Sequence, residues 1–305
     1  MEADTLIESI VRTFTFMAGI LGNSWLALVS LPKQRSDVRT NEVLFINLAV
    51  SDLITNYLVD LPDTAVHFAG RWFLGETFCG IFLFCADLSE TSSIYTTLFI
   101  SAFWHQKLVG SLKRGGAPVQ LDSLRLVGCL LVGSWMLATI FSIPHYFFAS
   151  VKRLNESHGG CVEVFPEALS KQTYEITFLV VANVFPLVGI IIASAQIVVT
   201  LLRNQRHVAS RESASSKTDP RVQPKQTPPK PSRSPQARAA KSVVAVASVV
   251  VLCWLTHLLL RLSSSIHTSS VVLEVAGYIA SSYTSIIPYI FLHGVKKLSC
   301  SCKKK

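Results

Sequence analysis

The sequence has little charge for its length. Only 15% of its 305 residues are Asp, Glu, Lys or Arg, whereas soluble domains carry about 25%. Half of the residues are hydrophobic, and the mean hydropathy is +0.43. A chain of this length could form two soluble domains, but a composition this apolar argues against them and indicates that lipid is the solvent.

The sequence also lacks the motifs of several functional classes. It has no His-Glu-x-x-His, no glycine-rich phosphate-binding loop, and no internal repeat of the kind that many transporters carry. The net charge of +9 gathers in loops and the tail rather than along one amphipathic face, which argues against nucleic-acid binding. We therefore expect no enzymatic activity, no cofactor and no metal site, and we keep a transporter only as an alternative.

What the sequence does contain is seven apolar stretches that are long enough to cross a membrane as helices. An α-helix needs about 20 residues to cross the hydrocarbon core, and prolines inside such stretches are tolerated within a membrane bundle. We expect an all-α membrane protein in which residues 1–305 form one seven-transmembrane-helix bundle. The predicted spans are Ile10–Leu31, Glu42–Phe68, Phe78–His105, Leu124–Phe148, Tyr174–Leu202, Ser242–Leu262 and Val271–His293.

Basic residues concentrate in alternate loops. The loops after the first, third and fifth predicted spans and the tail at 294–305 are basic, whereas the others are mixed or acidic. Cytoplasmic loops carry the excess of Lys and Arg, so the N-terminus should lie outside and the C-terminus in the cytoplasm. The loop at 204–239 is rich in Pro, Ser and Lys, and we expect it to be a disordered cytoplasmic segment. The acidic N-terminus has no cleavage site behind it, so the first span should itself be an anchor.

Cysteines and a sequon fall on the sides that this topology predicts. Cys79 starts the third span and Cys161 lies in the loop after the fourth, both on the outer side, where disulfides form and persist. Asn155, in Asn-Glu-Ser, is a glycosylation acceptor in that same loop. Cys300 and Cys302 lie among lysines just inside the last span, so they are candidates for palmitoylation. Two ordinary reduced cysteines are the alternative there.

Short motifs inside the spans carry a family resemblance. The first span holds Gly22-Asn23, and the second holds Asn47-Leu48-Ala49-Val50-Ser51-Asp52. Later spans hold Trp135, Pro186, Cys253-Trp254 and Pro288. Together these motifs resemble the rhodopsin-like, or class A, G-protein-coupled receptors, whose outer disulfide Cys79 and Cys161 also match. The resemblance covers the whole chain except the fifth loop and the tail.

Three positions depart from the class A pattern. Phe103-Trp104-His105 stands where that family has Asp-Arg-Tyr, Thr256 replaces the proline of the sixth helix, and Ile287 replaces the asparagine before Pro288. This combination resembles the vomeronasal type-1 receptors, and the stretch from Phe103 to Lys107 is most similar to their fish relatives, the olfactory receptors related to class A. Bitter taste receptors lack the counterparts of Cys79 and Asp52, so they fit less well.

Ionisable residues inside the spans are functional candidates, because a charge in the bilayer core is costly. By resemblance, Asp52 joins Asn23, Ser93 and Trp254 in a polar core. Since Ile287 replaces a member of that network, we expect a water-bridged network rather than sodium regulation.

The candidates for ligand binding lie in the third, sixth and seventh spans. Glu90 could pair with Arg261 or His257 in a salt bridge without a ligand. Alternatively, Arg261 or His257 anchors an anionic ligand between tyrosine walls. The full set of candidates is Asp87, Glu90, His257, Arg261, Tyr278 and Tyr283.

The inner end of the third span is the predicted face for a G protein. Its residues are Phe103, Trp104, His105 and Gln106, and an aromatic belt at the membrane interface is the alternative. The resemblance implies a chemosensory receptor of the plasma membrane for pheromones or odorants. Such a receptor would bind a small molecule between the outer halves of its helices and activate a heterotrimeric G protein of the inhibitory type. A non-sensory receptor for a small endogenous ligand is the alternative. A retinal pigment is excluded because the seventh span has no lysine for a Schiff base.

Overall fold

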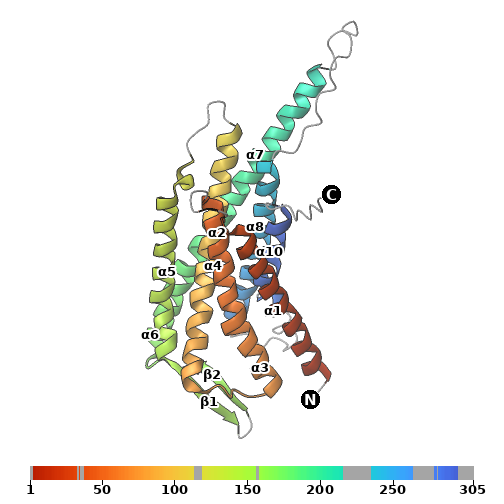
Figure 1. Ribbon diagram of the computed structural model, residues 1–305. Helices are drawn as coiled ribbons and strands as arrows, with labels where there is room; N and C mark the ends of the chain where they lie inside the picture. Colours follow the sequence, from red (N-terminus) through yellow and green to blue (C-terminus); the bar gives the residue numbers. More distant parts are fainter. Residues whose placement is uncertain are drawn as a thin grey trace.

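Long helices that run side by side make up most of the chain (Figure 1). The computed structural model describes residues 3–32, 34, 38–112, 119–155, 158–215, 235–263, 278–279 and 281–294. The first helix begins at the end of the bundle where a β hairpin lies, and α7 ends beyond the opposite end (Figure 1). In chain order the elements are α1 (Ala3–Ser30), α2 (Thr40–Thr55), η2 (Asn56–Asp60), α3 (Leu61–Ala69), α4 (Gly75–Leu112), η3 (Gln120–Asp122), α5 (Leu124–Phe147), β1 (Ala149–Asn155), β2 (His158–Glu163), α6 (Ala168–Phe178), η4 (Leu179–Val184), α7 (Phe185–Ser215), α8 (Pro235–Ser263) and α10 (Tyr283–Gly294).

Two of the predicted spans contain a π-helical turn directly before a proline. The elements α2, η2 and α3 run on as one helical span, as do α6, η4 and α7. Pro62 is the second residue of α3, and Pro186 is the second residue of α7. A proline has no N–H for the helical ladder and its ring crowds the carbonyl one turn before it, and a wider turn relieves that crowding. The turn η2 ends at Asp60, so this residue lies at the wider part of the helix.

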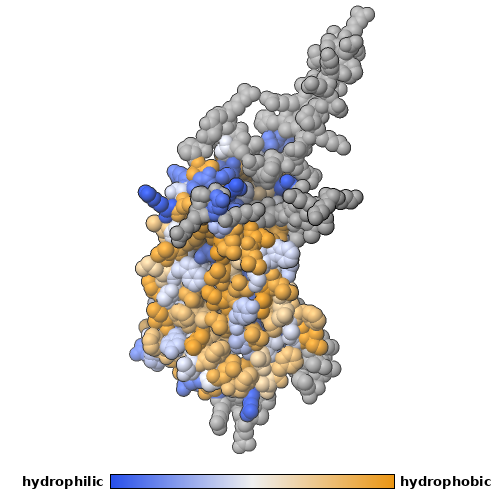
Figure 2. All heavy atoms as spheres, viewed as in Figure 1, coloured by the Kyte–Doolittle hydropathy of each residue, from blue (hydrophilic) through white to orange (hydrophobic). Residues whose placement is uncertain are grey.

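The outer surfaces of the helices are apolar. Among the described residues, five helical spans are long and apolar enough to cross a membrane, formed by α1, α2 to α3, α5, α6 to α7, and α8. Large side chains such as Phe14, Leu28, Val132 and Ile140 are exposed on them. Figure 2 shows hydrophobic residues covering the middle of the bundle, with hydrophilic residues gathered towards its ends. This is the surface that a chain immersed in lipid requires.

Helix α4 is more polar because it is surrounded by protein. It contacts α2, α5, α7 and α8, and hydroxyl groups line its contact with α2. Asn47 donates a hydrogen bond to the Thr96 hydroxyl at 2.7 Å, and the Ser51 and Ser92 hydroxyls are bonded at 2.8 Å. The indole N–H of Trp135 donates to the Asn47 side-chain oxygen at 2.9 Å. These bonds allow polar residues at membrane depth, since each finds a partner inside the bundle.

The Gly22-Asn23 motif marks a close approach of α1 to α10. A Cβ atom on Gly22 would lie 2.8 Å from Pro288 and 2.9 Å from Tyr289, which is too close for any other residue. Asn23 donates to the Thr284 carbonyl at 2.8 Å, and the Tyr289 hydroxyl donates to the Ala18 carbonyl at 2.9 Å. The motif therefore joins the first and seventh helices.

The loop between α5 and α6 forms an antiparallel β hairpin of β1 and β2, in which Val151 pairs with Cys161. A disulfide joins Cys161 to Cys79 at the start of α4, with the two Cα atoms 5.5 Å apart. The hairpin is therefore tied to the central helix. Hydropathy and loop charge predict the helices and the loop, but they do not reveal these two strands.

The predicted loop at 204–239 is wrong at both ends. Helix α7 continues to Ser215, and α8 begins at Pro235. Hydropathy marks where the chain leaves the membrane, whereas the helix continues through residues such as Gln, Arg, Ala and Glu that favour helix in water. The rest of this segment, 216–234, lies outside the described residues.

Candidate ligand site

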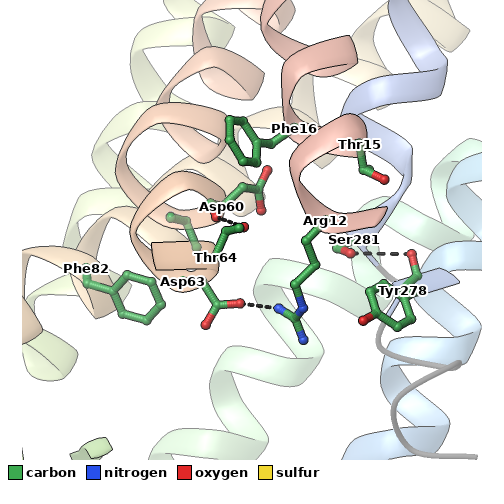
Figure 3. A pocket seen from close by; sticks show the side chains of 10 residues that line it. Arg12, Thr15, Phe16, Asp60, Asp63, Thr64, Phe82, Tyr278 and Ser281 are labelled. Carbon is green, nitrogen blue, oxygen red and sulfur yellow. Dashed lines mark hydrogen bonds and ion pairs between the residues drawn. The ribbon is translucent and has the colours of Figure 1, made fainter. Parts of the chain in front are cut away.

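A cavity of about 330 Å³ lies among α1, η2, α3, α4 and the beginning of the seventh span (Figure 3). It belongs to the end of the bundle that also carries the β hairpin (Figure 1). Charged side chains and aromatic rings line it together, with Phe16 beside Asp60 and Tyr278 beside Arg12 (Figure 3). The lining residues are Arg12, Thr15, Phe16, Val59, Asp60, Asp63, Thr64, Phe82, Tyr278 and Ser281.

Arg12 is the cationic group of this cavity, and it has acidic and aromatic partners. Its guanidinium donates to the Asp63 carboxylate, and it donates to one oxygen of Glu8 at 2.9 and 3.1 Å. The other Glu8 oxygen lies 2.9 Å from Nε2 of His67. The guanidinium also lies 5.3 Å from the centre of the Tyr278 ring, in cation–π contact. These contacts join α1 to α3 and to the start of the seventh span.

The carboxylate of Asp60 lies deeper and has no such partner. Its backbone carbonyl accepts a hydrogen bond from the Thr64 hydroxyl at 2.7 Å, as drawn in Figure 3. Within the described residues, its side chain makes no hydrogen bond or ion pair, and the guanidinium of Arg12 acts on it only as a nearby charge. A half-buried carboxylate without a partner is costly. With Arg12 already bound to Asp63, the cavity has one acidic group left to pair with a cation.

A polar core lies between this cavity and the opposite end of the bundle. Asp52 is fully buried, and its Oδ1 accepts a hydrogen bond from Ser93 at 2.8 Å. Asn23 donates to the carbonyls of Gly19 and Thr284. The remaining side-chain oxygens of Asp52 and Asn23 are buried and have no hydrogen bond within the described part of the chain. Trp254 is also buried and belongs to the hydrophobic core.

The aromatic pair at the far end of α4 packs inward. Phe103 and Trp104 are 2% and 9% exposed, and their rings meet edge to face with centroids 5.4 Å apart. His105 is half-buried. An interface belt would direct Phe103 and Trp104 towards lipid, so that interpretation is wrong for both. In this conformation they are core residues and offer no docking surface.

The next two residues attach α4 to the loop before α5. The side-chain oxygen of Gln106 accepts a hydrogen bond from the backbone N–H of Leu121 at 3.2 Å. Lys107 forms an ion pair with Asp122 at 3.0 Å. Helix α4 and the turn η3 therefore hold each other at this end of the bundle.

Comparison with known proteins decides the family. The sequence profile of the 7 transmembrane receptor (rhodopsin family) matches residues 22–290. The chain belongs to the rhodopsin family of seven-transmembrane receptors. It is therefore a seven-helix, multi-pass membrane protein rather than an enzyme, of a family typically found in the plasma membrane. The predicted fold class is confirmed, and so is the class A part of the resemblance.

Individual relatives of this receptor are distant. The chain is 25% identical to neuropeptide Y receptor type 6 of Mus musculus over 226 residues, which cover 70% of this chain and 58% of that protein. It is 24% identical to galanin receptor type 1 of Rattus norvegicus, over 85% of this chain and 68% of the relative. The fold is similar to that of squid rhodopsin, with a TM-score of 0.72, 15% identity, and coverage of 95% of this chain and 77% of that one. None of these relatives carries a vomeronasal or olfactory name.

Among the ligand candidates predicted from sequence, those whose side chains the structure describes do not all line this cavity. Tyr278 lines the cavity. Tyr283 does not line it. This side chain is 6% exposed and packs in the hydrophobic core, so the prediction that it forms a wall of the ligand site is wrong. Helix α10 begins at Tyr283, after a turn at Ser282, so Tyr278 belongs to the segment before that helix. Asp87 contacts His145 instead of the cavity.

The structure describes the other predicted site residues only in part. Glu90 is half-buried on α4 and has polar contacts of its own. The backbones of His257 and Arg261 belong to α8, but their side chains lie outside the described residues. Asn155 ends β1, with its side chain also outside the description. Cys300 and Cys302 lie in the undescribed tail, so palmitoylation stays a prediction.

Sequence reasoning missed the three charged residues that dominate the cavity. Arg12, Asp60 and Asp63 all fall inside the first two predicted spans. The rule that intramembrane charges mark functional sites applies to them as well as to Asp52 and Asp87. Applied to every span, that rule would have found them.

Proposed function

We propose that this receptor binds a small cationic molecule in the cavity beside Asp60 and passes the binding signal to a heterotrimeric G protein at the other end of the bundle. The observation that carries the proposal is the Asp60 carboxylate, which lines the cavity without a partner among the described residues. An amine or guanidinium would supply the missing partner through a charge-assisted hydrogen bond. Phe16, Phe82 and Tyr278 would enclose the apolar part of such a ligand.

The size of the cavity supports a small molecule. Its volume of about 330 Å³ is near the lower limit of ligand pockets, which range from about 300 to 1,000 Å³. The stretch from Phe103 to Lys107, which is similar to that of fish olfactory receptors, adds support for a chemosensory role, with pheromones or odorants as ligands. A small endogenous ligand outside the senses would use the same chemistry.

A peptide ligand is the second candidate, and the names of the relatives favour it. The neuropeptide Y and galanin receptors, and C-X-C chemokine receptor type 1 of Oryctolagus cuniculus, which is 23% identical over 87% of this chain and 65% of its own, are named for peptide or protein ligands. A peptide would place only one side chain in this cavity, for instance a lysine or arginine beside Asp60. The rest would lie over the hairpin end of the bundle.

Signal transfer through the bundle would follow the contacts of the first and seventh helices. Arg12 contacts Tyr278 at the cavity, and Asn23 contacts Thr284 further along the same two helices. A ligand that binds one arrangement of these helices better than the other shifts their equilibrium. The receptor's G-protein partner, of the inhibitory type by resemblance, would then bind a state in which Lys107 and its neighbours at the far end of α4 are uncovered.

The experiment is a calcium-signalling screen of the full chain expressed with a promiscuous Gα subunit. The library holds aromatic amines, guanidines, aromatic acids, bile acids and basic peptides. Amines or guanidines should activate the receptor. Asp60→Asn should raise their half-maximal concentration by about 10- to 100-fold, because that is the change in affinity expected when one hydrogen bond to a charged group is lost. The matched control is Glu175→Gln, an exposed carboxylate on α6 that pairs with Lys171 and does not line the cavity, and it should leave the half-maximal concentration unchanged.

Two outcomes would count against the proposal. A response to acids that is lost in Arg12→Gln but kept in Asp60→Asn would show an anionic ligand instead. A response to long peptides but to none of the small amines would favour the second candidate function.

A further inference from the structure

One imidazole and two carboxylates come together near the disulfide, outside the lining of the cavity. Asp87 lies on α4, His145 lies in the last turn of α5, and Glu163 ends β2, two residues after Cys161. Their side chains are 10%, 5% and 23% exposed. Three separate elements thus deliver metal-ligating groups to one buried place.

The geometry leaves the imidazole incompletely bonded. Nδ1 of His145 is hydrogen-bonded to Glu163. Nε2 lies 2.9 Å from an Asp87 oxygen, yet this buried nitrogen makes no hydrogen bond within the described part of the chain. One ligating atom from each of the three residues lies within 4.8 Å of the others.

The charge of this cluster also calls for a cation. Two carboxylates outweigh one imidazole even when the imidazole is protonated. Among the described residues, no Lys or Arg lies within ion-pair distance of Asp87 or Glu163. An excess of negative charge in a buried site is costly unless it is compensated, and a divalent cation would compensate it.

An aromatic shell holds the imidazole in place. The rings of Phe165, Tyr174 and Phe178 meet that of His145 edge to face, with centroids 6.5, 5.1 and 6.0 Å away. The Tyr174 hydroxyl donates to the carbonyl of Phe141, so the ring beside the imidazole is itself fixed. Packing of this kind around a ligand limits water access and sets its orientation.

We propose that Asp87, His145 and Glu163 bind a transition-metal dication of the Zn²⁺ class. One imidazole nitrogen and one oxygen from each carboxylate supply three ligands, and a fourth position stays open. Metal–ligand distances of about 2.0–2.2 Å require the ligating atoms to close in by roughly an ångström, and rotation of the Asp87 and Glu163 side chains about the fixed imidazole provides this. Ca²⁺ and Mg²⁺ fit poorly, because they take six or more oxygen ligands.

Bound metal would cross-link α4, α5 and the hairpin beside the disulfide. This site is independent of the cavity at Asp60, so it can exist whether or not the proposed function is right. The sequence predicts no metal site, since the three residues are far apart in the chain and match no ligand-spacing motif.

The test is zinc binding to the purified full-length receptor in lipid nanodiscs, measured by calorimetry and by thermal unfolding. The protein carries Cys300→Ser and Cys302→Ser, which remove the tail thiols as competing ligands. We expect one equivalent of Zn²⁺ to bind and to raise the unfolding temperature, with no such effect from Ca²⁺. Asp87→Asn, His145→Gln and Glu163→Gln should each weaken binding by at least about tenfold.

The matched control is His67→Gln. His67 also has a carboxylate neighbour, Glu8 at 2.9 Å, but it belongs to no three-ligand group in the described residues. The His67→Gln variant should therefore bind zinc with unchanged affinity. Unchanged affinity in Asp87→Asn and Glu163→Gln, or no saturable binding up to about 1 mM Zn²⁺, would overturn the site.

A second measurement does not depend on the folding of the variants. X-ray absorption of the zinc-loaded protein with an intact cluster should show only nitrogen and oxygen ligands at about 2.0–2.2 Å, including one imidazole. A sulfur ligand at about 2.3 Å, or a shell without imidazole, would place the metal elsewhere.

Discussion

The two ends of the bundle contain different kinds of interaction. At the hairpin end, charged side chains from distant parts of the chain meet in small groups, around Arg12 and Asp63 and around His145. At the other end, aromatic and aliphatic residues pack closely, as Phe45 does against Phe291 with ring centroids 4.8 Å apart. The charged groups suit selective binding, whereas the packed rings suit a bundle with a few discrete arrangements.

The comparison suggests which substitutions will change stability and which will change recognition. Charged pairs that are partly exposed contribute little to stability, but each can distinguish one ligand from another. Rings buried at the other end of the bundle, such as Phe45, contribute several kcal/mol to stability and contact no ligand in the cavity.

Loss of the disulfide should have the largest effect on the amount of folded receptor. Cys79→Ala or Cys161→Ala frees the hairpin from α4, and loss of a native disulfide from a small extracellular domain costs about 2–5 kcal/mol and often prevents folding. We expect little receptor at the cell surface, measured by surface labelling. The control is Cys129→Ala, an exposed free cysteine, which should be expressed normally. Normal expression of both disulfide variants would mean that the hairpin does not need its tether.

Phe103→Ala should destabilise the receptor by about 3–5 kcal/mol, because it leaves a cavity where a fully buried ring was. The measurement is thermal unfolding in detergent. The control is Phe147→Ala at the hairpin end, a ring that is 73% exposed and faces outward, which should have a much smaller effect. Equal effects would contradict the inward packing of Phe103.

Arg12→Gln should change recognition more than stability. It removes the cation that is bound to Asp63, so the cavity gains negative character and a cationic agonist should become about three- to tenfold more potent, from a change of roughly 1 kcal/mol. Dose–response curves for an amine agonist measure this. Lower potency would mean that Arg12 itself contacts the ligand.

Lys107→Ala should have the smallest effect. The side chains of Lys107 and Asp122 are 35% and 51% exposed, and such pairs contribute at most about 1 kcal/mol. The unfolding temperature should barely move. A large drop would show that the turn η3 depends on this pair.

Much of the fold could be predicted from the sequence, because its cause is local. The length of the apolar stretches locates the helices. Gly22 has no side chain and Asn23 has an amide that can donate, and these properties suit them to the close contact between α1 and α10. The hairpin could not be predicted in this way, since its register depends on pairing between β1 and β2. Hydropathy does not predict that α7 continues to Ser215, because it shows which residues favour lipid and not which residues favour a helix.

The candidate site was harder to predict, because it depends on which helix faces which. Tyr278 and Tyr283 are both tyrosines of one predicted span, yet only Tyr278 lines the cavity. Asp87 contacts His145 because α5 packs beside α4 at this end of the bundle. A single sequence contains no information on these pairings, although Arg12 and Asp60 were visible as charges inside predicted spans.

The charge preference of the Asp60 cavity can be measured directly with a pair of matched ligands. These are an amine agonist from the screen and its hydroxyl analogue, each measured on the wild-type receptor and on Asp60→Asn. We expect the wild type to prefer the amine by about 10- to 100-fold, and we expect this preference to fall below about threefold in the variant. A preference for the amine that is unchanged in Asp60→Asn would contradict the proposed role of Asp60.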